Sequence, residues 1–144
     1  KEMVALIGDK EAVFHRAFDV VPDWREAMDT LVDIGIKRIL TSGQKRSAPE
    51  GKDVIREMIS YAADRIEILP GAGIREGNVR DLLEVTGCRQ LHMSVRASFV
   101  DSSLQSNPAI NFGHPAIPED SRYDIIDAVN LKRVITALRQ EYDC

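Results

Sequence analysis

Three residues that could perform acid–base or ion-binding chemistry stand close together near the start of the chain: His15, Arg16 and Asp19. A histidine titrates near neutral pH, so His15 could act as a general base or as a ligand of a soft metal ion. It could equally be a structural histidine that is hydrogen-bonded inside the fold. Arg16 could hold a carboxylate or a phosphate through two parallel hydrogen bonds, or it could form an internal ion pair with Asp19.

Other polar or flexible residues also stand at the ends of apolar segments. The glycines of segment 71–73 precede a helix, so backbone N–H groups and a helix N-terminus could bind phosphate there. Glu76 in the first turn would oppose an anion, and glycines also occur in such turns for geometric reasons alone. The candidate catalytic residues are therefore His15, Arg16, Asp19 and His92, and the candidate ligand- or anion-binding residues are Thr41, Ser42, Gly43, Gly71, Gly73 and Ser94.

Strand-like and helix-like segments alternate along the chain and determine where these side chains lie. The strand-like segments are 12–18, 38–41, 66–69 and 90–95, and the helical apolar stripes are 27–32, 54–62, 79–83 and 131–138. This alternation predicts a parallel sheet with helical crossovers. The pattern leaves open a complete four-stranded open sheet and one half of an eight-stranded α/β barrel. In a barrel the candidate residues would meet at the C-terminal rim of the strands.

Two parts of the chain do not follow this alternation. Residues 1–8 are typical of the tail of a helix that ends at Gly8, with no N-cap ahead of it, which indicates a start inside a longer fold. Residues 96–127 are rich in Ser, Asn, Pro and Gly and predict an irregular loop before the last helix, either functional or a mobile surface insertion. The chain, residues 1–144, is otherwise expected to form a single unit.

Composition limits the partners and the cellular compartment. The formal charge is −4, whereas a nucleic-acid-binding protein usually carries a basic stripe, so we expect no nucleic-acid partner. The two cysteines, Cys88 and Cys144, are too few for a disulfide scaffold, which favours a reducing cytoplasm. No apolar run is long enough for a membrane span and no signal peptide opens the sequence, so we expect no membrane partner.

Four segments together resemble the CutC family of copper homeostasis proteins. They are FHRAFD at 14–19, RILTSGQ at 38–44, LPGAGI at 69–74 and LHMS at 91–94. The resemblance covers roughly residues 1–98 and continues more loosely to the last helix. It implies a TIM (β/α)8 barrel, of which this chain would supply strands five to eight with their helices, that is, the C-terminal half barrel.

The resemblance also implies a function: cytosolic binding or handling of copper(I). The cysteines proposed as copper ligands in the family have no counterpart here, and Cys88 and Cys144 do not match them, so the metal ligands stay unknown. The alternative function is a barrel enzyme that transfers protons on a small phosphorylated or carboxylated substrate at the strand rim. A half barrel exposes two sheet edges and an inner face, which predicts a homo-oligomer.

Overall fold

The computed structural model describes residues 2–100 and 122–139. The elements follow one another in the order α1 (Glu2–Leu6), β1 (Val13–Phe14), the 3-10 helix η1 (Arg16–Val20), α2 (Trp24–Asp33), β2 (Arg38–Thr41), α3 (Lys52–Ala62), β3 (Glu67–Pro70), α4 (Glu76–Thr86), β4 (Arg96–Val100), β5 (Arg122–Ile126) and α5 (Ala128–Arg139). The chain is therefore an α/β protein, and its strands and helices alternate from β1 to α4 as predicted, whereas β5 is the next described element after β4. Within the described ranges, no helix is both long enough and apolar enough to cross a membrane.

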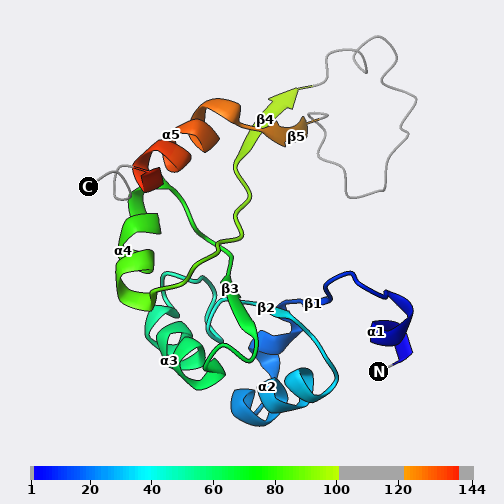
Figure 1. Cartoon of the computed structure of the whole chain (residues 1–144). Coiled ribbons are helices and arrows are strands. Elements are labelled where there is room, and N and C mark those ends of the chain that lie inside the picture. The colour runs from blue at the N-terminus through cyan, green and yellow to red at the C-terminus, as the bar shows by residue number, and fades with distance from the viewer. Residues whose placement is uncertain (1, 101–121, 140–144) are drawn as a thin grey trace.

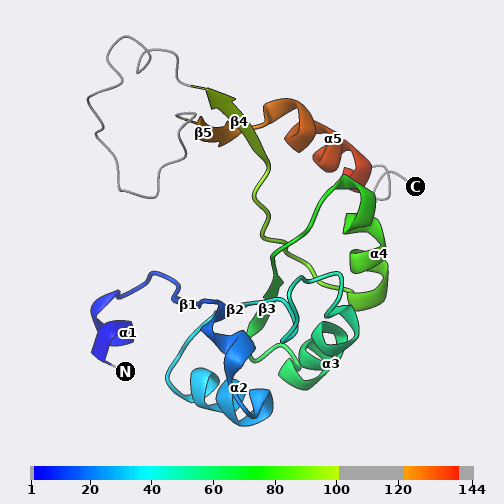
Figure 2. The ribbon, with the colours of Figure 1, turned by 180° about the vertical axis from the view of Figure 1, so that it is seen from behind.

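A three-stranded parallel sheet in the order β1-β2-β3 forms the centre of the fold. Its pairing places Ile39 opposite Ile68, and both side chains are buried. Figures 1 and 2 show α2, α3 and α4 along one side of these strands. The core lies between these two layers. It contains the residues predicted from the helical stripes, among them Met28, Leu31, Ile55, Met58, Val79 and Leu82.

Local sequence signals mark the start of α2 and the ends of α2 and α4, as the sequence predicts. The Asp23 carboxylate caps α2 by accepting hydrogen bonds from the backbone N–H groups of Arg25 and Glu26, at 2.8 and 3.3 Å. Gly35 follows α2 with a φ of +89°, and Gly87 ends α4 with a φ of +65°. Glycine adopts this left-handed conformation at little cost, so both positions stop a helix and turn the chain toward the next strand.

The first and fourth predicted strands differ from the observed elements. The first is shorter, because the chain enters η1 immediately after His15. Segment 90–95 forms no strand, and only a single parallel bridge joins Gly71 to His92, with the His92 N–H donating to Pro70 O at 2.9 Å. A strand forms where several consecutive residues pair with a neighbouring strand. Among the described residues, no strand lies on the far side of segment 90–95 to pair with it.

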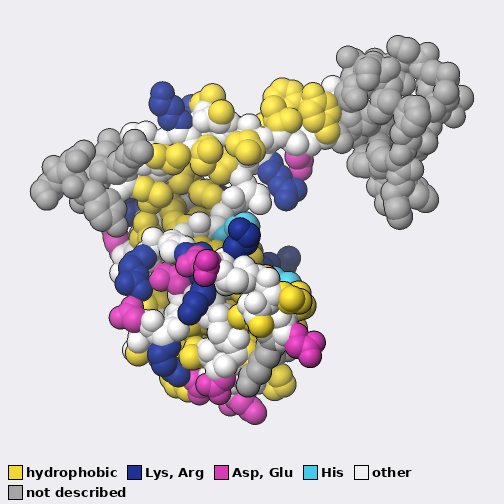
Figure 3. Space-filling model, turned by 45° about the vertical axis from the view of Figure 1, so that its right-hand side comes forward, with side chains coloured by type: hydrophobic (Ala, Val, Ile, Leu, Met, Phe, Trp, Pro, Cys, Tyr) yellow, Lys and Arg dark blue, Asp and Glu magenta, His cyan; other side chains and the backbone are white. Residues whose placement is uncertain are grey.

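The prediction of an irregular loop over residues 96–127 is wrong at both of its ends. These ends are β4 and β5, which pair antiparallel, and the central residues 101–121 lie outside the described part of the chain. The register places four apolar residues on one face of this hairpin: Ala97, Phe99, Tyr123 and Ile125. Figure 3 shows hydrophobic side chains gathered on the hairpin. The alternation of apolar residues was a usable strand signal, but 21 intervening residues concealed the pairing.

Candidate functional site

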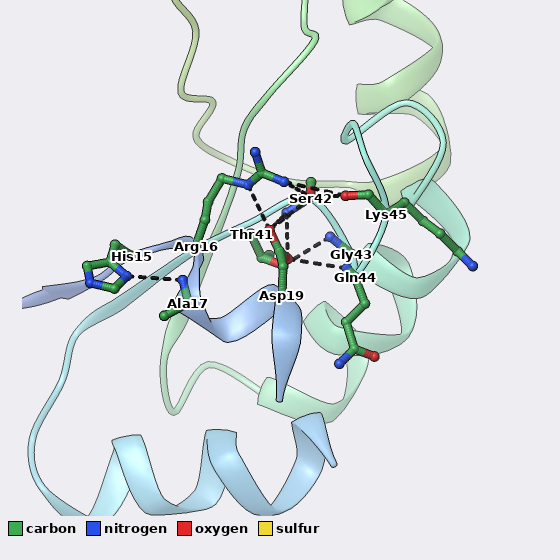
Figure 4. A network of polar contacts seen from close by, with 9 residues as sticks. All are labelled: His15, Arg16, Ala17, Asp19, Thr41, Ser42, Gly43, Gln44 and Lys45. Carbon is green, nitrogen blue, oxygen red and sulfur yellow. Dashed lines mark hydrogen bonds and ion pairs between the residues drawn. The ribbon is translucent and has the colours of Figure 1, made fainter. Parts of the chain in front are cut away.

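The carboxylate of Asp19 joins η1 to the C-terminal end of β2 (Figure 4). One oxygen, Oδ1, accepts hydrogen bonds from Thr41 Oγ1 at 2.5 Å, from Ser42 N at 3.0 Å and from Gln44 N at 3.2 Å. The other oxygen, Oδ2, accepts from Arg16 Nε at 2.7 Å and from Ser42 Oγ at 2.9 Å. The carboxylate therefore fixes the loop that leads from β2 to α3.

The environment of Asp19 keeps its carboxyl group ionised. Burial alone would raise its pKa, since the side chain is only 7 % exposed. Hydrogen bonds from Thr41, Arg16 and Ser42 to the charged form outweigh burial, and the net effect is a pKa below the ordinary value. A carboxylate with this many donors has little capacity left to accept a proton from a substrate, so Asp19 is suited to positioning rather than to base catalysis.

The hydroxyl group of Ser42 is fully engaged within the same network. Arg16 Nη2 donates to Ser42 Oγ at 2.6 Å. The single proton of this hydroxyl can be donated either to Asp19 Oδ2 or to the Lys45 carbonyl oxygen, which lies at 2.5 Å. A carbonyl oxygen is not a base, and the lowered pKa of Asp19 makes its carboxylate a weak one, so neither acceptor is suited to activating Ser42 as a nucleophile.

Arg16 presents part of its guanidinium group to solvent. The internal ion pair with Asp19 is present, and Nε and Nη2 carry the hydrogen bonds to Asp19 and Ser42. In Figure 4 no dashed line reaches the third nitrogen, Nη1, and the side chain is 41 % exposed. The ammonium group of Lys45 points away from Arg16 in the same view. Arg16 thus forms a positive group of fixed orientation that could bind one oxygen of an anion.

His15 has a structural role as the cap of η1. Its Nδ1 accepts a hydrogen bond from the Ala17 backbone N–H at 3.0 Å, and its ring stacks on Phe14 with a centroid distance of 5.3 Å. An accepting Nδ1 in the neutral ring leaves the proton on Nε2. Figure 4 shows the imidazole directed away from Asp19. His15 therefore offers an exposed N–H donor beside the network but makes no described hydrogen bond to Arg16 or Asp19.

The glycines of the loop after β3 have packing reasons to be glycine. A Cβ at Gly71 would lie 2.7 Å from Leu40 Cδ1, and a Cβ at Gly73 would lie 2.8 Å from Ser47 Cβ. Gly73 also has a φ of +74°. Since Glu76 begins α4 directly after this loop, the helix N-terminus carries a negative side chain. The loop is thus explained by geometry, and phosphate binding there stays a prediction.

His92 and Ser94 are both exposed and lie beyond the far side of β3. Because the strand order is β1-β2-β3, two strands separate His92 from His15 within one chain. The structure therefore brings together Arg16, Asp19, Thr41, Ser42 and Gly43 but not His92 or Ser94. Sequence reasoning overlooked Gln44, whose side-chain amide donates to Val21 O at 2.8 Å. The signal available in the sequence was that Gln44 directly follows the candidate residue Gly43.

The CutC family model matches residues 1–97. This chain belongs to the CutC family. It is 38 % identical over 136 residues to a CutC family protein of Treponema denticola, covering 94 % of this chain and 55 % of the relative. It is 33 % identical over 139 residues to a mouse protein named copper homeostasis protein cutC homolog, covering 96 % of this chain and 51 % of the relative.

A solved structure supports the same relationship. CutC from Streptococcus agalactiae, described as a copper homeostasis protein, aligns with a TM-score of 0.60 and 33 % identity, over 64 % of this chain and 46 % of that one. The chain spans about half the length of the curated CutC relatives that it matches.

The described residues of this CutC family member do not form a copper site. In residues 2–100 and 122–139, no group of three or more His, Cys, Asp or Glu side chains is arranged to hold a metal ion. Cys88 is a free thiol that is 8 % exposed, and burial raises its pKa. It lines a 240 Å³ pocket with Asp64, Glu67 and Arg89 at the N-terminal end of β3, opposite the Asp19 network. Copper(I) prefers several sulfur ligands, and Cys88 supplies the single sulfur atom in the lining of this pocket, so the pocket does not fit copper(I).

Proposed function

We propose that this chain is part of a protein that acts in copper homeostasis in the cytoplasm, by binding or handling copper(I). Membership of the CutC family is the observation that supports this role. Because Cys88 is the one thiol among the described residues, and no group of three or more His, Cys, Asp or Glu side chains lies together there, we infer that copper(I) ligands come from elsewhere in the functional assembly. The residues of this chain would then stabilise the fold of the protein or bind a ligand other than copper(I).

A copper(I) titration tests this assignment of the ligands. We expect the purified chain to remove no stoichiometric copper(I) from a chromophoric chelator under anaerobic conditions. The full-length mouse relative serves as the control protein. The same titration is run on the double variant Cys88→Ser/Cys144→Ser, which lacks every cysteine of the chain. Tight binding of one equivalent by that double variant would show that our account of the ligands is wrong.

The second candidate function is recognition of a small phosphorylated or carboxylated compound at the C-terminal ends of the strands. The observation that favours it is the fixed guanidinium of Arg16: Nε and Nη2 are engaged, Nη1 makes no contact with the other residues drawn in Figure 4, and the side chain is 41 % exposed. The exposed N–H of His15 lies on the neighbouring residue and would supply a proton or a second hydrogen bond. An enzyme of this class would use Arg16 for orientation and histidine for proton transfer.

Anion binding can be tested with Arg16→Lys, which keeps the charge but loses the fork-shaped donor set. We expect inorganic phosphate to raise the melting temperature of the wild-type chain at constant ionic strength, and Arg16→Lys to weaken phosphate binding by about tenfold or more. Arg56→Lys is the matched control, since Arg56 is an exposed arginine on α3 that pairs only with Asp53 in the described structure. An equal thermal shift in all three proteins, or no shift in the wild type, would exclude the Arg16 site.

We also propose that the described sheet is one half of an eight-stranded barrel and that the chain forms a homo-oligomer. The sheet supports this, since among the described strands β1 pairs with β2 alone, and helices α2, α3 and α4 lie along one side of the sheet. All-parallel sheets occur almost always with both faces covered.

A further inference from the structure

The side chains of two cations at the C-terminal end of β2 take no part in the network around Asp19. Lys45 and Arg46 stand in the loop between β2 and α3, and both are exposed. Among the described residues, neither of them forms an ion pair. Arg16 lies close by on η1, and no interaction in Figure 4 reaches its third nitrogen, Nη1. Three positive groups can therefore meet a ligand at this end of the strands.

The acidic side chains of the same region leave it with an excess of positive charge. Together, η1 and the loop 42–51 carry three cations and two carboxylates. The carboxylate of Asp19 is already paired with Arg16, and Glu50 accepts a hydrogen bond from Ser47 Oγ at 2.9 Å. A local excess of one sign concentrates ligands of the opposite sign, even though the whole chain has a formal charge of −4.

The carbonyl group of Lys45 belongs to the network that orients Arg16. Its oxygen accepts a hydrogen bond from Ser42 Oγ at 2.5 Å and from Arg16 Nη2 at 3.4 Å. The same residue therefore fixes the place of one cation through its backbone and carries another on its side chain. In Figure 4 the Lys45 ammonium group points away from Arg16, so the two positive charges lie on separate sides of their shared contact.

The rest of the loop leaves little freedom to its backbone. Gly43 and Gln44 adopt left-handed φ angles of +70° and +58° in succession, which turns the chain just before Lys45. Further along, the Ala48 N–H donates to Ala72 O at 2.9 Å and ties the loop to the turn after β3. A segment that is held at both ends keeps its exposed side chains in one place, so less entropy is lost when they bind a ligand.

We propose that the anion-binding site at Arg16 has a second subsite, formed by Lys45 and Arg46, and that its ligand carries two separate anionic groups. One group binds Arg16, and the other, at the far end of a short carbon chain, binds the two loop cations. The ligand class is a small carboxylic acid that also carries a phosphoryl group. This inference rests on the anion-binding function proposed above for Arg16.

The separation of the cations favours such an extended ligand over a compact one. A single phosphate that binds Arg16 Nη1 would meet the Lys45 ammonium group only if the lysine side chain turned back toward Arg16. That movement would bring two like charges together. A ligand with two charged ends neutralises both cations where they are. The fixed fork of Arg16 would orient the first group, and the flexible lysine would adapt to the second.

A matched pair of ligands tests the second subsite. The compounds 3-phosphonopropionate and propylphosphonate have chains of equal length and differ in that a carboxylate replaces the terminal methyl group. We expect titration calorimetry at constant ionic strength to show about fivefold tighter binding of 3-phosphonopropionate by the wild-type chain. The preference should shrink as the sodium chloride concentration rises, because exposed charges hold the second group.

Removing the two loop cations tests whether they are the groups responsible. We expect Lys45→Gln/Arg46→Gln to lose the preference and to bind both ligands equally. The control is Lys10→Gln/Lys37→Gln, which removes the same charge from two exposed lysines that precede β1 and β2, at the opposite ends of these strands. The control should keep the fivefold preference. Because all four side chains are exposed, both variants should melt within a few degrees of the wild type.

The outcomes separate this inference from the anion function on which it rests. If neither ligand binds, or if Arg16→Lys binds both as tightly as the wild type, the anion function itself is wrong and the second subsite fails with it. If the wild type binds both ligands equally and Arg16→Lys weakens both, the Arg16 site is retained and the second subsite is excluded. A preference that survives Lys45→Gln/Arg46→Gln would show that another group holds the carboxylate.

Discussion

Replacing Asp19 with asparagine is expected to lower the free energy of unfolding by about 3 kcal/mol. The wild-type carboxylate accepts hydrogen bonds from Thr41, Ser42, Gln44 and Arg16 while its side chain is only 7 % exposed. An amide of the same shape turns at least one N–H toward these donors, and the Arg16 cation loses its counter-charge. Urea unfolding at pH 7 measures the loss directly.

Asp33→Asn provides the matched control, because Asp33 is an exposed carboxylate at the last residue of α2. Its replacement should change stability by no more than about 0.5 kcal/mol. If Asp19→Asn unfolded at the same urea concentration as Asp33→Asn, the network in Figure 4 would not be holding the β2–α3 loop.

The contribution of Asp19 should also depend on pH with a definite sign. The pKa of Asp19 in the folded protein lies below the ordinary value of 3.8, so the unfolded chain binds the proton first as the pH falls. The stabilisation is therefore complete above about pH 4 and is lost as the pH falls through the folded pKa. The difference in unfolding free energy between wild type and Asp19→Asn should be constant from pH 7 to pH 5 and should shrink near pH 3.

The sequence predicted the part of the site that depends on local patterns. Residues after successive parallel strands meet at one edge, and this rule brought Arg16 and Asp19 to Thr41 and Ser42. The Arg16–Asp19 ion pair was one of the two readings of Arg16, and the structure contains it. Sequence alone did not indicate that Asp19 accepts so many hydrogen bonds, because several of the donors are backbone N–H groups whose directions depend on the loop conformation.

The sequence was a poor guide where structure depends on distant partners. Segment 90–95 has an apolar strand pattern, but a strand forms only where a neighbour supplies a continuous ladder, and the described fold supplies a single bridge at His92. The hairpin of β4 and β5 shows the reverse case, since each strand was hidden within a polar region and the pairing joins Arg96 to Ile126 across a long separation. Both errors concern long-range pairing, which no local window of sequence contains.

Replacing Gly51 with alanine is expected to destabilise the chain by about 3 kcal/mol or more. A Cβ at this position would overlap the backbone oxygen of Ser42 and would lie 3.0 Å from Gly43 Cα. These contacts are with backbone atoms, which cannot rotate away as a flexible side chain could. The start of α3 would have to move away from the end of β2, and Ser42 would leave its hydrogen-bonding position on Asp19. The melting temperature measured by circular dichroism reports the loss.

Two other glycines separate this steric effect from the general effect of adding a methyl group. Gly77, in the first turn of α4, has nothing within 4 Å of the position that an alanine methyl group would take, so Gly77→Ala should stabilise the chain by about 0.5–1 kcal/mol. Gly87 has equally open space but a φ of +65°, so Gly87→Ala should cost about 1 kcal/mol through backbone strain alone. A Gly51→Ala chain as stable as Gly87→Ala would contradict the steric argument.

Gly51 and Asp19 should also be coupled, because both act on the joint between β2 and α3. Once Gly51→Ala has displaced Ser42, the carboxylate of Asp19 has fewer donors left to lose. The double variant Asp19→Asn/Gly51→Ala should therefore be less destabilised than the sum of the two single variants, by about 1 kcal/mol or more. Asp19→Asn combined with Gly87→Ala should be additive, since Gly87 ends α4 at the opposite end of the sheet. Equal additivity in both pairs would mean that the close approach of Gly51 to Ser42 and the Asp19 network stabilise the fold independently.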